Sequence, residues 1–134
     1  MSESTTWTAA TIAEPVRAAF EAADPVAIES LLSPDVTWGP PEQRRTRVTC
    51  KNRQQVMAWW TSGPNATSKA DVTELTVAGD QLLVGLHVRP DAASDFEGPF
   101  ERWQILTVDD RGVADIRGYE DRPSAAADLG TTRR

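Results

Sequence analysis

The sequence predicts an α+β fold, in which a strongly curved antiparallel sheet packs on N-terminal helices around an apolar pocket and forms a cone. Apolar residues recur at helical spacing in the first half of the chain, whereas long segments of the second half alternate between apolar and polar residues. Helices that precede antiparallel strands in this way pack on one face of the sheet. A long sheet that curls around a helix leaves an open mouth, which is a natural binding pocket.

The first helix is expected from about Ile12 to Ala23. Thr11 and Glu14 have the spacing of a capping box, and Pro15 then falls in the first turn, where its missing N–H does little harm. Asp24, which is followed by a proline, is expected to begin a second, short helix, because aspartate caps helices and proline suits their first position.

The remaining elements follow from turn residues and from the spacing of apolar residues. The strand over 81–89 has the clearest alternation, since Leu82, Val84, Leu86 and Val88 share one face. The expected ranges are 25–32 and 53–61 for helices, 35–38, 71–77, 81–89, 100–108 and 113–121 for strands, and 123–129 for a final helical turn.

The composition fits one small domain that spans residues 1–134, with an ordered core over about 11–129. The net charge is -6 and the pI is about 4.7, and so acidic a chain has no electrostatic reason to approach nucleic acid. A single cysteine, Cys50, excludes an intrachain disulfide and favours a reducing compartment. No apolar run approaches the length of a signal peptide or a membrane span, so we expect a soluble, cytoplasmic protein without a membrane partner.

Neither a metal nor another cofactor is expected. The chain has one histidine and one cysteine, which do not make a ligand set, and no carboxylate spacing suggests a metal site. The sequence also lacks a glycine loop of the kind that holds a phosphate group.

Five short segments follow one another after the two N-terminal helices: 35–38 (DVTW), 50–56 (CKNRQQV), 79–80 (GD), 103–108 (WQILTV) and 115–122 (DIRGYEDR). In this order they resemble the nuclear-transport-factor-2-like superfamily, and more narrowly its SnoaL-like branch, which is common in actinobacteria. The resemblance covers roughly residues 12–129. It implies a cone-shaped fold, a pocket between sheet and helices, and a homodimer through the outer face of the sheet.

The resemblance does not by itself imply one function. Members of the superfamily include polyketide cyclases, ketosteroid isomerases, dehydratases, epoxide hydrolases and binding domains without catalysis. One position departs from the cyclase pattern. In the polyketide cyclases an aspartate on the last strand is the acid and base, and the alignment places Gly118 there. Glycine cannot do this chemistry, which argues against a cyclase-type acid and base at that position.

Two side chains are candidate catalytic groups. Glu120 shares one face of the last strand with Ala114, Ile116 and Gly118, and loss of water at a pocket rim would raise its pKa toward a value useful for proton transfer. Its alternative role is a solvated edge residue paired with an arginine. His87 is the only histidine, a residue type suited to general-base catalysis, but strand alternation turns it outward, where it would be a surface or dimer-interface residue.

Further residues are candidates for the wall of the pocket. Gln104 and Arg102 share strand parity with Leu106, so Gln104 is expected inside the pocket and Arg102 nearer its mouth. A buried glutamine amide needs partners, which a ligand, a neighbouring side chain or a water can supply. The tryptophans Trp38, Trp59 and Trp60 are expected either to line the pocket or to be plain core.

The sequence therefore predicts a protein that binds a small hydrophobic or aromatic molecule, such as a polyketide-like compound. As an enzyme it would carry out cofactor-independent proton transfer: isomerisation, cyclisation, dehydration or epoxide opening. Gln104 would orient the substrate and Glu120 would move the proton. The alternative, which Gly118 favours, is a non-catalytic ligand-binding or dimeric interaction domain.

Overall fold

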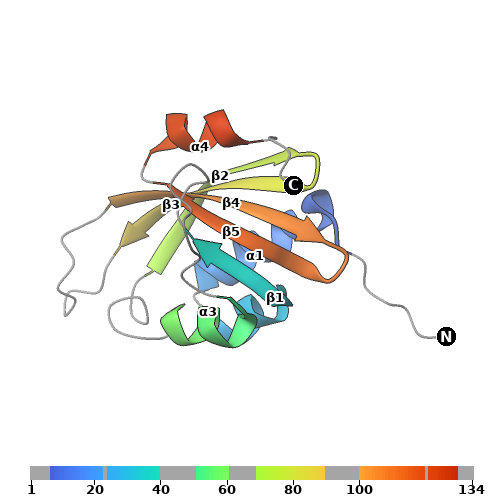
Figure 1. The fold of residues 1–134 in the computed structure, drawn as a ribbon. Helices are drawn as coiled ribbons and strands as arrows, with labels where there is room; N and C mark the ends of the chain where they lie inside the picture. Colours follow the sequence, from blue (N-terminus) through green and yellow to red (C-terminus); the bar gives the residue numbers. More distant parts are fainter. Residues whose placement is uncertain are drawn as a thin grey trace.

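The computed structural model describes residues 7–22, 24–39, 51–60, 69–89, 100–119 and 121–129 (Figure 1). Its helices are α1 (Ala9–Ala22), α2 (Pro25–Ser30), α3 (Arg53–Trp60) and α4 (Arg122–Asp128). Its strands are β1 (Leu32–Gly39), β2 (Lys69–Ala78), β3 (Gln81–Arg89), β4 (Phe100–Asp109) and β5 (Gly112–Tyr119). None of the helices in these ranges is long and apolar enough to cross a membrane.

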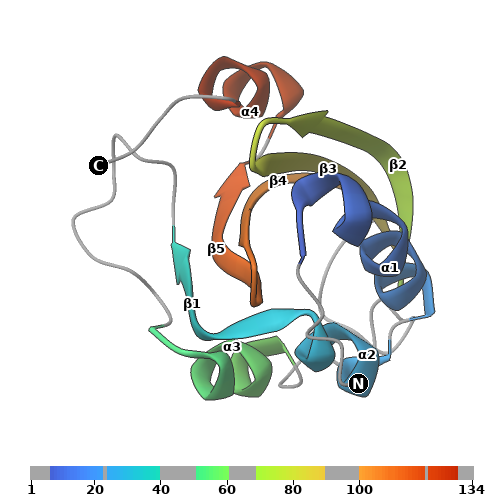
Figure 2. The same cartoon turned by 90° about the vertical axis from the view of Figure 1, so that its right-hand side faces the viewer.

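The strands form one curled sheet in the order β1-β5-β4-β3-β2 (Figure 2). Figure 2 shows α1 on the concave side of the sheet and α4 on its outer side. The α+β fold with a curved sheet and N-terminal helices is therefore confirmed. The sheet is not antiparallel throughout, because β1 at its edge runs parallel to β5, while the other neighbouring strands are antiparallel.

The helix α1 begins three residues before the predicted start. Thr8, rather than Thr11, caps it: the backbone N–H of Thr11 donates to Oγ1 of Thr8 at 3.1 Å, and the N–H of Thr8 donates to Oγ1 of Thr11 at 2.9 Å. This is the reciprocal arrangement of a capping box, with threonine in place of the usual glutamate or glutamine. The sequence predicted Pro15 in the first turn of the helix. Because the helix begins earlier, Pro15 instead lies inside it.

The strand β1 also begins earlier than the sequence predicted, at Leu32, so that Ser33 and Pro34 belong to the strand instead of ending the helix before it. Proline is tolerated here because β1 is an edge strand, in which a backbone N–H can be missing without breaking a ladder.

The first residues of β5 lie directly against the connection between α2 and β1. The N–H of Val113 donates to the carbonyl oxygen of Leu31 at 2.8 Å. Gly112 has a φ of 128°, and a Cβ on it would lie 2.4 Å from that same oxygen. Only glycine fits this position, since any side chain would be strained and would clash with the backbone.

The concave face of the sheet and the N-terminal helices enclose the main apolar core. Each fully buried aliphatic side chain contributes about 2 kcal/mol by leaving water. The core includes Ile12 and Val16 of α1, Val84 of β3, Leu106 of β4 and Ile116 of β5, all almost fully buried.

The helix α4 covers a second, smaller core on the outer face of β3, β4 and β5. This core consists of Leu83, Trp103, Ile105, Tyr119 and Ala125, with Leu129 packed against it. The sequence predicted only a final helical turn here, without a place on the sheet.

Arg122 of α4 forms an ion pair with Glu74 of β2 and so connects the helix to the sheet. Its Nε and Nη2 donate to Oε1 and Oε2 of Glu74, each at 2.8 Å, and its guanidinium lies 5.9 Å from the centre of the Trp103 ring. Trp103 in turn lies over Gly85, where a Cβ would come within 2.5 Å of the ring. The absence of a side chain at Gly85 therefore allows the Trp103 ring to pack there, and Arg122 stacks on this ring.

The Glu74 contact predicts how stability depends on pH. Hydrogen bonds from Arg122 and Thr76 lower the pKa of the Glu74 carboxyl from 4.5 to about 2. Because the folded-state pKa is lowered, the stabilisation is complete above pH 4.5 and is lost as the pH falls toward 2. Urea unfolding should therefore show wild type more stable than Glu74→Gln at neutral pH, with the difference shrinking in that acid window.

A control for this prediction is Asp71→Asn, which removes another carboxylate of β2, paired with Arg89 at 3.0 Å on the surface and away from α4. A pH-independent difference between wild type and Glu74→Gln would contradict the role given to Arg122.

Candidate functional site

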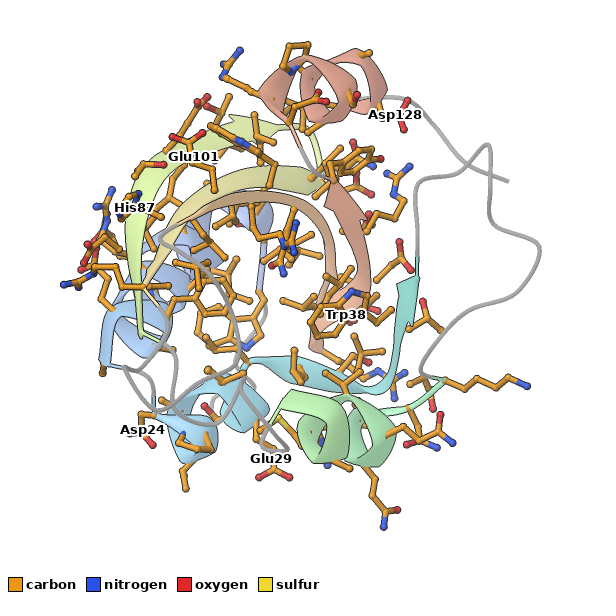
Figure 3. All side chains as sticks on the ribbon, turned by 90° about the vertical axis from the view of Figure 1, so that its left-hand side faces the viewer. Asp24, Glu29, Trp38, His87, Glu101 and Asp128 are labelled. Carbon is orange, nitrogen blue, oxygen red and sulfur yellow. The ribbon has the colours of Figure 1, made fainter. Side chains whose placement is uncertain are left out.

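A row of cross-strand neighbours lies at the centre of the candidate site on the concave face. Gln104 of β4 pairs with Val84 of β3 on one side and with Gly118 of β5 on the other. Trp38 of β1 borders this row, since a Cβ on Gly118 would lie 3.9 Å from Nε1 of Trp38. Figure 3 shows the Trp38 side chain pointing into the interior of the curled sheet.

Gln104 carries the only buried polar side-chain atom on the concave face for which the described part of the chain offers no partner. The residue is 8% exposed, and no described residue donates a hydrogen bond to Oε1. An unpaired amide oxygen in such a place costs about 1–3 kcal/mol. The site is therefore better satisfied when a hydrogen-bond donor enters it.

A void about the size of one water molecule lies farther toward the N-terminal helices, and Gln104, Gly118 and Trp38 are not among the residues that line it. It is lined only by apolar side chains, among them Phe20 of α1, Leu31, and Leu106 of β4. Leu106 is two residues beyond Gln104 on the same strand face, a distance of about 7 Å. The described part of the concave face is thus largely apolar around the Gln104 amide.

The inward orientation of Ile116 and Gly118 agrees with strand alternation. The pairing of β4 with β5 is irregular between Thr107 and Val108, which pair with Asp115 and Val113, so Ala114 is an extra residue. This β-bulge lies before Ile116 and does not change which residues face inward after it.

His87 lies on the outer face of the sheet, away from Gln104. In the register of the sheet its neighbours are Asp71 of β2 and Glu101 of β4. Figure 3 shows His87 and Glu101 outside the curled sheet, whereas Trp38 is inside it. This is the side that strand alternation predicted for the histidine.

The other predicted site residues are only partly within the described chain. Arg102 is exposed and pairs with Leu86 at the end of the concave row. The backbones of Trp59 and Trp60 belong to α3, but their side chains lie outside what the structure describes, as does Glu120.

Sequence reasoning missed a buried charge on the outer face. Arg117 is fully buried, with its Nε 3.7 Å from Oδ2 of Asp115, and Oδ1 of Asp115 accepts from the Thr37 hydroxyl. The position of Arg117 could have indicated its burial. Arg117 follows Ile116 in the middle of β5, a strand with buried residues on both faces. Such a charge is retained only where acidic or polar groups offset its burial.

The two strand glycines next to aromatic rings should tolerate a methyl group differently. Gly118→Ala places its Cβ in ordinary contact with Trp38 and should change the free energy of unfolding by no more than about 0.5 kcal/mol. Gly85→Ala drives a Cβ into Trp103 and should cost about 1–3 kcal/mol. Urea denaturation of both variants measures this, and equal costs would mean that the space beside Trp38 is closed.

Comparison with known proteins gives the same fold. The family model of the SnoaL-like domain matches residues 13–116. No match was found among curated proteins.

Solved structures of similar fold come from several bacteria. An NTF2-like protein of unknown function from Burkholderia pseudomallei is 16% identical, with 93% of this chain and 98% of that chain covered and a TM-score of 0.66. A proposed polyketide cyclase from Sinorhizobium meliloti is 21% identical, with 84% and 100% covered and a TM-score of 0.63. A proposed ketosteroid isomerase from Kribbella flavida is 15% identical, with 98% and 92% covered and a TM-score of 0.65.

At these identities the solved structures show a shared fold and not a shared activity. The family model spans most of the chain, and the sheet, the N-terminal helices and their order agree with it. The chain belongs to the SnoaL-like family, and it shares the fold of NTF2-like structures.

Proposed function

We propose that the protein binds a small hydrophobic or aromatic molecule, of a polyketide-like kind, between the concave face of the sheet and the helices. The observation that carries this proposal is the buried, unpaired amide oxygen of Gln104, set in an apolar surface beside Gly118 and Trp38. Pockets for such ligands have this character: apolar walls and a few polar groups that fix the orientation.

A catalytic form of this proposal assigns proton transfer to Glu120. It would move a proton at the pocket rim while Gln104 holds a carbonyl or hydroxyl group, and the tryptophans Trp38, Trp59 and Trp60 would shape the cavity. The reaction would be an isomerisation, cyclisation, dehydration or epoxide opening without a cofactor. The names of two structural neighbours, a proposed polyketide cyclase and a proposed ketosteroid isomerase, support this class of chemistry.

A binding protein without catalysis is the second candidate, and one observation favours it. Among the described residues of β3, β4 and β5, none of those on the concave face is an aspartate, a glutamate or a histidine. Gly118, at the place of the cyclase aspartate, belongs to this face. Of the two candidate catalytic groups, His87 lies on the outer face, so proton transfer in the pocket would fall to Glu120.

A homodimer in the cytoplasm remains part of the proposal. The outer face of the sheet, which the family resemblance implies as the dimer interface, is covered over β3, β4 and β5 by α4. A dimer on that face would therefore include α4 in its contact, and His87 would lie near the interface rather than in the pocket.

Binding in the proposed place can be tested by filling it. Gly118→Leu puts four more carbon atoms between Gln104 and Trp38 and should reduce the affinity for flat aromatic compounds at least tenfold. Quenching of tryptophan fluorescence measures the binding. Glu101→Leu, which introduces the same side chain at an exposed position of the outer face, is the control and should bind as wild type does. Unchanged binding by Gly118→Leu would place the ligand elsewhere.

The catalytic form has a separate test. Glu120→Gln should lower kcat at least about a hundredfold on a ketosteroid, epoxide or polyketide substrate that the wild type turns over. Glu101→Gln, an exposed glutamate on the outer face, is the matched control and should retain full activity. Full activity of Glu120→Gln would remove the proton-transfer role from this residue.

A further inference from the structure

We infer that the ligand of this site presents an uncharged hydrogen-bond donor, a hydroxyl or a ring N–H, from a flat apolar body, and that Oε1 of Gln104 accepts from it. This inference rests on the proposed small-molecule function and specifies the chemical class of the ligand. It identifies Gln104 as the residue that determines specificity.

The position of Gln104 fixes what its amide can reach. The strand pairing places it between Val84 and Gly118, and neither residue has a polar side chain. Leu106, on the same face of β4, is also apolar and almost fully buried. The described neighbours therefore leave Oε1 without a donor, and a carbonyl-type oxygen can be satisfied only by a donor.

The surroundings select a neutral donor over a charged one. A buried cation would need a carboxylate, and the described concave face of β3, β4 and β5 has none. A buried anion would face the partial negative charge of the amide oxygen, and Arg102, the cation on the described part of this face, is exposed at the end of the row. Burying either charge unpaired costs far more than burying a hydroxyl or N–H that is hydrogen-bonded.

The shape of the site selects a flat body. Among the described residues, only the Trp38 indole comes within 4 Å of where a Cβ on Gly118 would lie, at ordinary van der Waals distance. Aromatic rings pack well against an indole in offset or edge-on geometry.

A second buried glutamine shows that the unpaired state is particular to Gln104. Gln81 on β3 is 3% exposed, and its Nε2 donates to Oγ1 of Thr107 at 3.5 Å. Gln81 is thus satisfied within the chain on the outer face, whereas Gln104 is not. The pair offers matched variants, Gln104→Met and Gln81→Met, with the same change of side chain.

Three tricyclic compounds of nearly identical shape test the inference. Carbazole carries a ring N–H, dibenzofuran has an oxygen acceptor in its place, and fluorene has a methylene group. We expect the wild type to bind carbazole about tenfold more tightly than fluorene or dibenzofuran, as one buried hydrogen bond provides. Equilibrium dialysis measures all three affinities under the same conditions.

The variants should separate the amide from the rest of the site. Gln104→Met should bind the three compounds with equal affinity, because methionine accepts only weakly and preserves the volume. Gln81→Met should keep the preference for carbazole. If Gln104→Met does not fold, as circular dichroism would show, the wild-type series still decides the question.

Each outcome has a distinct meaning. If none of the compounds binds, the proposed function itself is wrong. If all three bind the wild type equally, the site binds small molecules but Gln104 does not select a donor. Tightest binding of dibenzofuran would show that the amide presents its NH2 group, and the inferred ligand class would be overturned.

Discussion

The structure depends on the contact between the start of β5 and the connection from α2 to β1. The carbonyl of Leu31 accepts the N–H of Val113, and the lack of a side chain on Gly112 allows the two segments to approach. This contact starts the parallel pairing of β1 with β5 at Leu32 and Val113. Because β1 lies beside β5, Trp38 comes next to Gly118, which strand parity turns to the concave side together with Gln104.

Much of the fold could be predicted from the sequence because it depends on local patterns. Alternation alone placed β3 at its observed bounds, and Asp24 with its proline placed the start of α2. The start of α1 was wrong because a threonine performs the role that the capping pattern gives to glutamate. The parallel pairing of β1 could not be predicted, since it joins residues at opposite ends of the chain, and no local signal records it.

The candidate site was predictable to the extent that strand parity governs it. Parity directed Gln104 and Gly118 to the concave face and His87 away from it, and the β-bulge in β5 falls where it leaves that order unchanged. Parity says nothing about whether a side chain finds a partner, so the contrast between Gln104 and Gln81 required the structure. The burial of Arg117 was missed for the same reason, because the cover over the outer face follows from tertiary packing.

The pairing of β1 with β5 has a consequence for how the protein is made. The helices α1 and α2 leave the ribosome before the strands that cover them, with the apolar face of Ile12, Val16 and Phe20 ready to be buried. The strand β1 can pair with β5 only after all the strands between them in the sequence have been synthesised. Pairing between distant segments is slow, and uncovered apolar faces aggregate in the meantime. A nascent chain that stalls before β5 is therefore a natural client for chaperones.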